Sequence, residues 1–169
     1  MGILYDGASN AGLIGYSDSD WAADKDDRRS MGAYTFLMAN GAIAWSSKKQ
    51  HVVSLSSTEA EYMALSQAAA QGAWLQNFLS EIHFPLQRPL SIIGDNKGSI
   101  DIANNPITGR GTKHIAIRFH YIRECIADKS ITLTRLPSSS IIADTLTKPL
   151  PFPSFSTHRT ALGIFSLPP

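Results

Sequence analysis

The sequence predicts a single α/β domain in which a mixed β-sheet carries helices on its faces. The segment GAYTFLMA, then Asn40-Gly41, then AIAWSS is a strong hairpin signal, because an Asn-Gly pair readily adopts the positive φ angles of a tight turn. A long amphipathic helical pattern follows over residues 57–83, and strand and helix patterns then alternate. Strands first and helix–strand alternation afterwards are typical of a mixed sheet covered by helices. The 169 residues, 43% of them hydrophobic, are enough chain for one core.

The strand assignments rest on alternation and on short apolar runs. GLIGYSD alternates small and large side chains, and SITLTRL alternates in a similar way. LSIIGD is a short apolar strand after a Pro-containing loop, and DKDDRRS is a charged turn between the first strand and the hairpin. The expected strands are residues 12–18, 32–39, 42–47, 90–95 and 130–136.

The helix assignments rest on the 3.6-residue period. NKGSIDIAN and SSSIIADTLTK are expected to be short helices, and Pro149 ends the second. KHIAIRFHYIRECIAD is expected to be a longer one, with a core stripe of Ile115, Phe119, Ile122 and Ile126. The expected helices are residues 57–83, 96–104, 113–128 and 138–148, with one short helix around residues 157–164. We also expect Trp21, Trp45 and Trp74 to lie in the core.

Bulk composition excludes little and indicates an intracellular protein. The net charge of +1 neither requires nor excludes a nucleic-acid partner, although the basic residues cluster, for example at Lys48 and Lys49. The single cysteine, Cys125, cannot form an intrachain disulfide and is expected to be a small core residue on a helix. No run of about 18 apolar residues occurs, so no membrane span is expected.

Glu59 and Glu61 stand two positions apart at the start of the long helix. At about 100° per residue they lie about 200° apart around the helix, so they face different surroundings. Ser56-Ser57-Thr58-Glu59 is a capping-box pattern, which gives Glu59 an ordinary role at the helix start. Glu61 could cap with Thr58 in the same way, but it heads the apolar stripe, where a carboxylate is costly unless it is paired or holds a metal.

Three aspartates stand in comparable positions. Asp18 and Asp95 end apolar strands, and Asp144 lies one turn past Ile141 in the last short helix. A strand-end aspartate alone is usually a turn or cap residue. If the strands of Asp18 and Asp95 are neighbours, their carboxylates converge and would repel each other without a cation. Mg²⁺ suits such a site, and two ions can activate a water and stabilise a leaving oxygen in phosphodiester cleavage.

Competing chemistries find little support in the sequence. G-x-x-x-x-G-K-[ST] does not occur, which leaves a phosphate-binding P-loop unsupported, and no G-x-S-x-G motif of a serine hydrolase occurs. One cysteine and five scattered histidines give no zinc-site spacing. The four acids therefore suggest phosphoryl transfer without proving it.

Five stretches resemble the ribonuclease H domain of copia-type retrotransposon polyproteins. They occur in the family's order and spacing over roughly residues 12–150: GYSDSDWAADKDDRRSMGAYTF, AIAWSSKKQHVVSLSSTEAEYMAL, GDNKGSIDIANNP, RGTKHIAIRFHYIRE and IIADTLTKPL. LSSTEAEYMAL and the pattern TKHIxIRxHxIRE are close to family signatures. The resemblance divides the chain into an upstream segment of a longer polyprotein (1–11), a ribonuclease H-like domain (12–150) and a C-terminal tail (151–169).

The resemblance implies a ribonuclease H-like fold, with a mixed five-stranded sheet of three antiparallel strands and parallel additions, flanked by helices. It implies an endonuclease that cuts the RNA strand of RNA–DNA hybrids during reverse transcription with two Mg²⁺ ions, or Mn²⁺ in their place. The catalytic, metal-binding acids carried over by motif are Asp18, Glu61, Asp95 and Asp144, with Asp18 bridging both ions. A reverse transcriptase domain of the same polyprotein is the implied partner. The implied location is intracellular, in a cytoplasmic retrotransposon particle or the nucleus.

Contacts to the hybrid are also implied by the resemblance. Backbone and hydroxyl groups of Ser57 and Thr58, together with Asn96 and Lys97, would lie near the scissile phosphate and read the 2′-OH of the RNA strand. Helix capping and helix-start chemistry are compatible alternatives for these residues. On the helix from residue 113, a second face of basic and aromatic residues would contact the phosphate backbone or would simply be solvated: Lys113, His114, Arg118 and Tyr121.

The chain departs from the cellular enzymes in two loops. Many cellular ribonucleases H carry a histidine in the loop before the last aspartate, where this sequence has LPSSSII. Many also insert a basic helical protrusion where this sequence has the short NPITGRGTK. Three alternatives stay open: a non-catalytic nucleic-acid-binding module, a different nuclease on the same fold such as an integrase or junction resolvase, and a host-recruited domain.

Overall fold

The computed structural model describes residues 1–7, 12–84, 86, 88–105 and 116–166, with the backbone alone for residues 116–120. Five strands form its main sheet: β2 (Ile14–Asp20), β3 (Met31–Met38), β4 (Gly41–Lys49), β5 (Leu90–Gly94) and β6 (Ile131–Arg135). Their order in the sheet is β4-β3-β2-β5-β6. β2, β3 and β4 pair antiparallel, whereas β5 runs parallel to β2 and β6 runs parallel to β5. This is the predicted mixed sheet, and the predicted fold class is confirmed.

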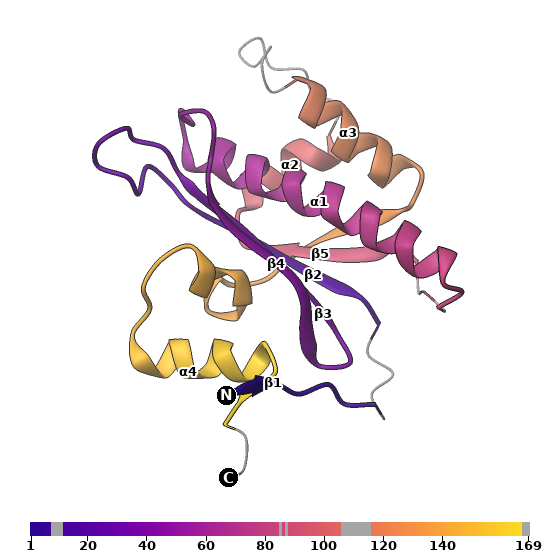
Figure 1. Cartoon of the computed structure of the whole chain (residues 1–169). Helices are drawn as coiled ribbons and strands as arrows, with labels where there is room; N and C mark the ends of the chain where they lie inside the picture. The colour runs from indigo at the N-terminus through magenta and orange to yellow at the C-terminus, as the bar shows by residue number, and fades with distance from the viewer. Residues whose placement is uncertain (8–11, 85, 87, 106–115, 167–169) are drawn as a thin grey trace.

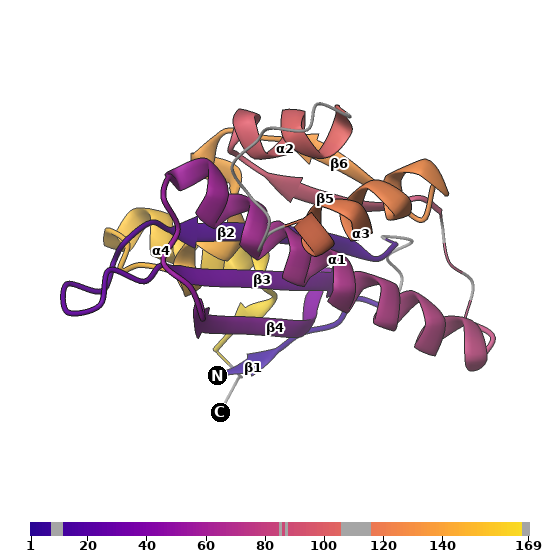
Figure 2. The ribbon, with the colours of Figure 1, turned by 90° about the horizontal axis from the view of Figure 1, so that it is seen from above.

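Helices cover both faces of the sheet (Figures 1 and 2). One face carries α1 (Ser57–Glu81), α2 (Lys97–Asn104) and α3 (Ala116–Ala127). The other carries two 3₁₀ helices, η1 (Ser138–Ser140) and η2 (Ile142–Leu146), and the C-terminal helix α4 (Phe152–Ala161). Among the described residues, no helix is both long enough and apolar enough to cross a membrane.

The main core lies between the sheet and the three helices α1, α2 and α3. Apolar side chains of the strands, such as Phe36 and Ile92, pack there against Tyr62 and Leu65 of α1. Cys125 is a buried member of this core, as predicted. A second, smaller cluster on the other face joins the sheet to η2 and to the end of α4: Leu37, Ala42, Ile142 and Leu162.

α1 begins with the predicted capping box. Ser56 is the N-cap, and its hydroxyl accepts a hydrogen bond from the Glu59 backbone N–H at 3.2 Å. Glu59 reaches back and accepts from the Leu55 backbone N–H at 2.7 Å, so both ends of the box are satisfied. The apolar stripe is buried from Glu61 to Leu79. The helix was predicted to run to residue 83 but ends at Glu81, and Ile82, which follows it, is exposed.

Three local predictions are wrong. The hairpin turn is formed by Ala39 and Asn40, which have positive φ angles of 51° and 61°, and Gly41 already begins β4. The segment around Asp144 forms η1 and η2, because Ile141 is extended between two single turns and interrupts any longer helix. The three tryptophans lie outside the core, with 50% to 58% of each exposed: Trp21, Trp45 and Trp74.

The two ends of the described chain lie together against the sheet. β1 (Gly2–Ile3) pairs antiparallel with β7 (Ile164–Phe165), and the Leu4 N–H donates to the Gly163 carbonyl at 2.8 Å. The tail helix starts earlier than predicted, at Phe152, because Pro153 fits the first turn of a helix. The division of the chain at residues 11 and 150 stays a prediction.

Gly163 is packed where no side chain fits. Its φ angle is +78°, and a Cβ there would lie 2.8 Å from the Asn40 carbonyl oxygen and 2.9 Å from the Gly41 Cα. These neighbours are backbone atoms that no rotamer change can move aside. We therefore predict that Gly163→Ala lowers the free energy of unfolding by about 1–3 kcal/mol, measured by urea denaturation. The control is Gly7→Ala, since a Cβ at Gly7 meets nothing within 4 Å; equal stability of the two variants would contradict this prediction.

Candidate metal centre

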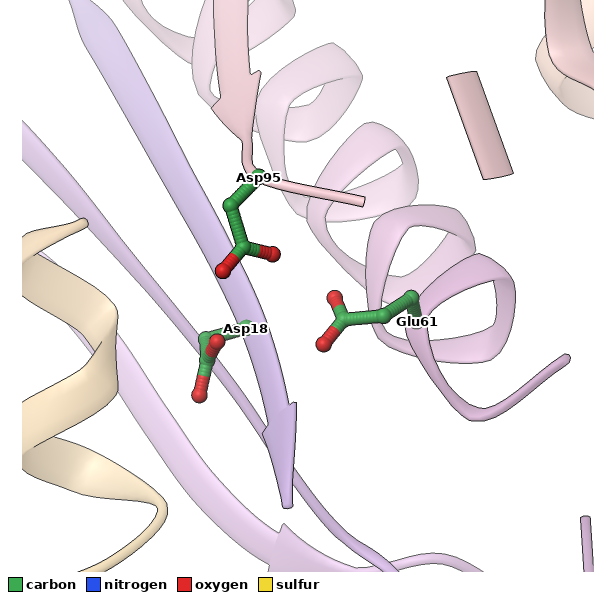
Figure 3. Close-up of side chains that lie close together, drawn as sticks. All are labelled: Asp18, Glu61 and Asp95. Carbon is green, nitrogen blue, oxygen red and sulfur yellow. The ribbon is translucent and has the colours of Figure 1, made fainter. Parts of the chain in front are cut away.

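Three carboxylates converge where β2, β5 and α1 meet (Figure 3). Asp18 projects from β2, Asp95 follows the last residue of β5, and Glu61 comes from the first turns of α1. One oxygen of each carboxylate lies within 4.8 Å of one oxygen of the other two. The sequence predicted this convergence on the condition that β2 and β5 are neighbours, and they are parallel neighbours in register at Tyr16 and Ile93.

Burial sets the electrostatics of this group. Asp18 is 2% exposed and Glu61 is 8% exposed. Burial, opposed by the hydrogen bond from Thr147 and aided by the nearby charge of Asp144, raises the pKa of Asp18 to about 6. Burial also raises the pKa of Glu61 to about 8, and the charges of Asp18 and Asp95 act in the same direction. Both carboxylates are therefore costly to ionise unless a cation joins them.

Two hydroxyl groups fix the orientation of the aspartates. The Thr147 hydroxyl donates to Asp18 Oδ2 at 2.5 Å, and the Ser138 hydroxyl donates to Asp95 Oδ2 at 2.5 Å. The Ser19 backbone N–H donates to Glu61 Oε1 at 3.0 Å. Sequence reasoning missed both hydroxyls. The position of Thr147, one turn after Asp144, could have indicated that it lies near the site. No sequence pattern indicates that Ser138 contacts Asp95, because that contact depends on the fold of η1.

Asp144 lies beside the three carboxylates but is engaged elsewhere. It sits in η2, its charge raises the pKa of Asp18, and its Oδ1 pairs with Lys148 Nζ at 2.5 Å. Burial lowers the pKa of the Lys148 ammonium, but the hydrogen bond to Asp144 and the charges of the nearby aspartates together outweigh burial, so the net pKa is raised. The lysine was not among the predicted site residues. Asp144 as a metal ligand stays a prediction.

The chemistry of these donors fits a hard divalent cation. All the converging atoms are carboxylate oxygens, which Mg²⁺ and Mn²⁺ prefer as ligands. A cation would offset both the burial and the repulsion of these charges, which raise the pKa values. Asp95 is only partly buried, which leaves room for waters. Neither histidine nor cysteine belongs to the group, so a zinc site is not indicated.

The residues predicted to contact a hybrid are only partly tested. Thr58 lies against the start of α2, since a Cβ on Gly98 would be 3.0 Å from the Thr58 hydroxyl. Asn96 caps α2 by accepting from the Ser99 N–H at 2.9 Å, and Lys97 and Ser57 are exposed. The N-termini of α1 and α2 thus lie close to each other, and the contact of these four residues with a hybrid stays a prediction. Capping, the ordinary alternative, is confirmed for Asn96.

The basic face predicted on α3 falls mostly outside the described residues. Lys113 and His114 lie outside them, and so does the side chain of Arg118. Tyr121 is described, and it packs partly against the main core. Its role as a phosphate contact stays a prediction.

Comparison with known proteins agrees with this geometry. No protein-family model matches the chain. The chain is 37% identical over 168 residues to the retrovirus-related Pol polyprotein from transposon RE1 of Arabidopsis thaliana. Its fold matches that of LC11-RNase H1, isolated from compost, in complex with an RNA/DNA hybrid, with a TM-score of 0.57 and 16% identity over 79% of this chain and 92% of that one. In sequence the chain is a homologue of part of a retrovirus-related Pol polyprotein, and in fold it is similar to ribonuclease H domains.

The match to that polyprotein covers 99% of this chain but only 12% of the polyprotein. Its fold also matches part of the protease–reverse transcriptase of prototype foamy virus, with a TM-score of 0.57 and 17% identity over 82% of this chain and 20% of that one. The resemblance seen in the sequence is therefore confirmed.

The raised pKa values make the stability of this domain depend on pH. The folded state binds protons more tightly than the unfolded state, so stability falls as the pH rises from about 4, the range of the unfolded pKa values, to about 8. We predict that Glu61→Gln raises the melting temperature in EDTA at pH 8 by at least about 3 °C, because the amide carries no charge to desolvate. At pH 4 the gain should disappear.

The matched control is Glu59→Gln, measured by the same thermal unfolding. Glu59 caps α1, and glutamine also serves in a capping box, so this variant should melt close to wild type at both pH values. A Glu61→Gln variant that melts at or below the wild-type temperature at pH 8 would contradict the cost of burying this carboxylate.

Proposed function

We propose that this chain is a ribonuclease H that hydrolyses the RNA strand of RNA–DNA hybrids with two Mg²⁺ ions, for which Mn²⁺ can substitute. The observation that carries the proposal is the group formed by Asp18, Glu61 and Asp95, whose oxygens lie within 4.8 Å of one another in a ribonuclease H-like fold. The hybrid in the complex of the compost enzyme supports the choice of substrate. The Pol polyprotein relative supports a reverse transcriptase domain as the partner.

Asp18 has the central part in this proposal. Its side chain lies between Glu61 and Asp95 on one side and the η2 segment with Asp144 on the other, since it accepts from Thr147 in that segment. Asp18 would therefore hold both ions, Glu61 and Asp95 would complete one site, and Asp144 would complete the other. Bound divalent cations would supply an activated water and charge stabilisation for the leaving 3′ oxygen.

The edge beside the carboxylates suits the RNA strand. Ser57 and Thr58 at the start of α1 and Asn96 and Lys97 at the start of α2 present hydroxyl, amide and ammonium groups next to Asp95 and Glu61. Two helix N-termini also favour a nearby phosphate. We propose that these groups position the phosphate and read the 2′-OH.

The experiment is cleavage of an end-labelled RNA–DNA hybrid by this chain, in Mg²⁺ and separately in Mn²⁺. Asp18→Asn and Glu61→Gln should each reduce the rate at least about 100-fold, because each removes a charge that a divalent cation requires. Glu59→Gln should cut like wild type, since Glu59 lies on the opposite side of α1 from Glu61 and caps the helix there. Labelled double-stranded DNA and double-stranded RNA of the same sequence test whether the hybrid is selected.

The outcomes separate the proposal from its rivals. A wild-type chain that binds the hybrid but leaves it intact in both metals would be a binding module. Cleavage that survives in both Asp18→Asn and Glu61→Gln would show that these carboxylates are not the reactive centre.

Lys148 provides a separate prediction about metal binding. Its ammonium pairs with Asp144 and is attracted to the charge of Asp18. It therefore competes with a cation for the same carboxylates. Lys148→Gln should therefore bind Mn²⁺ more tightly, by up to about fivefold for a partly exposed ion pair, in calorimetric titration.

Lys129→Gln is the control for the loss of one positive charge. Lys129 precedes β6, at the opposite end of this strand from the Asp95 edge, and this variant should keep the wild-type affinity. Tighter binding in both variants would mean that net charge, and not the pair with Asp144, sets the affinity.

A further inference from the structure

A buried histidine of the tail helix contacts the loop before the last aspartate. His158 on α4 is 4% exposed, and its Nε2 lies 3.2 Å from the carbonyl oxygen of Ser139 in η1. A carbonyl only accepts hydrogen bonds, so Nε2 carries the hydrogen and donates it. The bond joins two segments that are 19 residues apart in the chain.

The loop that His158 holds also carries a donor to the metal centre. Ser138, the neighbour of Ser139 in η1, donates its hydroxyl to Asp95 Oδ2 at 2.5 Å. An unbroken path of contacts therefore leads from α4 through the backbone of η1 to a carboxylate of the candidate metal centre. The imidazole itself ends on the Ser139 backbone, so it acts on the loop and not on a substrate.

The loop depends on such anchors because it is otherwise poorly packed. Every residue of η1 is exposed, and η1 has no side-chain cap. Its own turn is closed by the Ser140 N–H, which bonds to the Pro137 carbonyl at 2.8 Å. Ile141 is buried just after it and fixes one end. The bond from His158 fixes the middle of the loop, next to the serine that contacts Asp95.

We infer that His158 is a positioning residue of the metal centre: through Ser139 it holds the Ser138 hydroxyl on Asp95, and this makes the tail helix α4 part of the support of the site. The inference rests on the proposed function, since it assumes that Asp95 binds a divalent cation. Outer contacts that orient a ligand contribute to metal affinity even though they never touch the metal.

The test is the affinity for Mn²⁺, measured by calorimetry on the full chain, with thermal unfolding recorded for every variant. Ser138→Ala and His158→Ala should each weaken binding about tenfold, which is the usual effect of losing an outer contact. The double variant should bind no more weakly than Ser138→Ala, because both changes break the same path. His158→Gln should restore most of the affinity, since its amide N–H can reach the same carbonyl.

Leu162→Ala is the control for loss of packing alone. Leu162 caps the same helix and lies in the second cluster with Leu37 and Ile142, so its truncation should lower the melting temperature. It leaves the His158 bond in place and should keep the wild-type Mn²⁺ affinity. Equal weakening in Leu162→Ala and His158→Ala would overturn the inference, because helix docking alone would then explain the effect.

Two further outcomes separate this inference from the proposed function. A wild-type chain that binds no Mn²⁺ would overturn the proposed function, and this inference with it. A wild-type chain that binds Mn²⁺ while Ser138→Ala binds equally well would overturn this inference alone. Ser138 is exposed, so its variant keeps the test decisive even if His158→Ala does not fold.

Discussion

The burial of two carboxylates beside β2 is the constraint on which the candidate site depends. Asp18 and Glu61 are almost without solvent, and this burial is the main cause of their raised pKa values. The surrounding hydrogen bonds partly offset the cost of this burial: a backbone N–H donates to Glu61, and hydroxyl groups donate to Asp18 and Asp95. A site built in this way gives up stability in the free protein so that a cation meets carboxylates already in place.

Both layers of the fold contribute to the centre. α1 supplies Glu61 from one face of the sheet, and η2 and its C-cap residue supply Asp144 and Thr147 from the other. Asp18 on β2 and Asp95 after β5 lie between them. The sheet is joined by continuous pairing of its five strands, whereas the support from the second face consists of single turns and a short helix. Metal binding and the docking of that second face should therefore be coupled.

The predictable part of the site followed from periodicity. Glu61 stood out as a carboxylate on an apolar helix stripe, and Asp18 and Asp95 stood out at strand ends, because both signals are local in the sequence. The pairing of Asp144 with Lys148 and the contact of Ser138 with Asp95 depend on where two 3₁₀ turns come to lie, which no repeat encodes. The prediction of buried tryptophans failed because the size of a side chain does not by itself place it in the core. Trp74 instead stacks on Phe78 at the outside of α1, with ring centroids 5.4 Å apart.

The pairing of β1 with β7 has a mechanical consequence. Gly2 and Ile3 lie beside Phe165 and Ile164 in antiparallel register. A force that pulls these two segments apart would therefore break their few hydrogen bonds one after another. Such a geometry yields at low force. The five-stranded sheet would carry tension only after this short pair had opened.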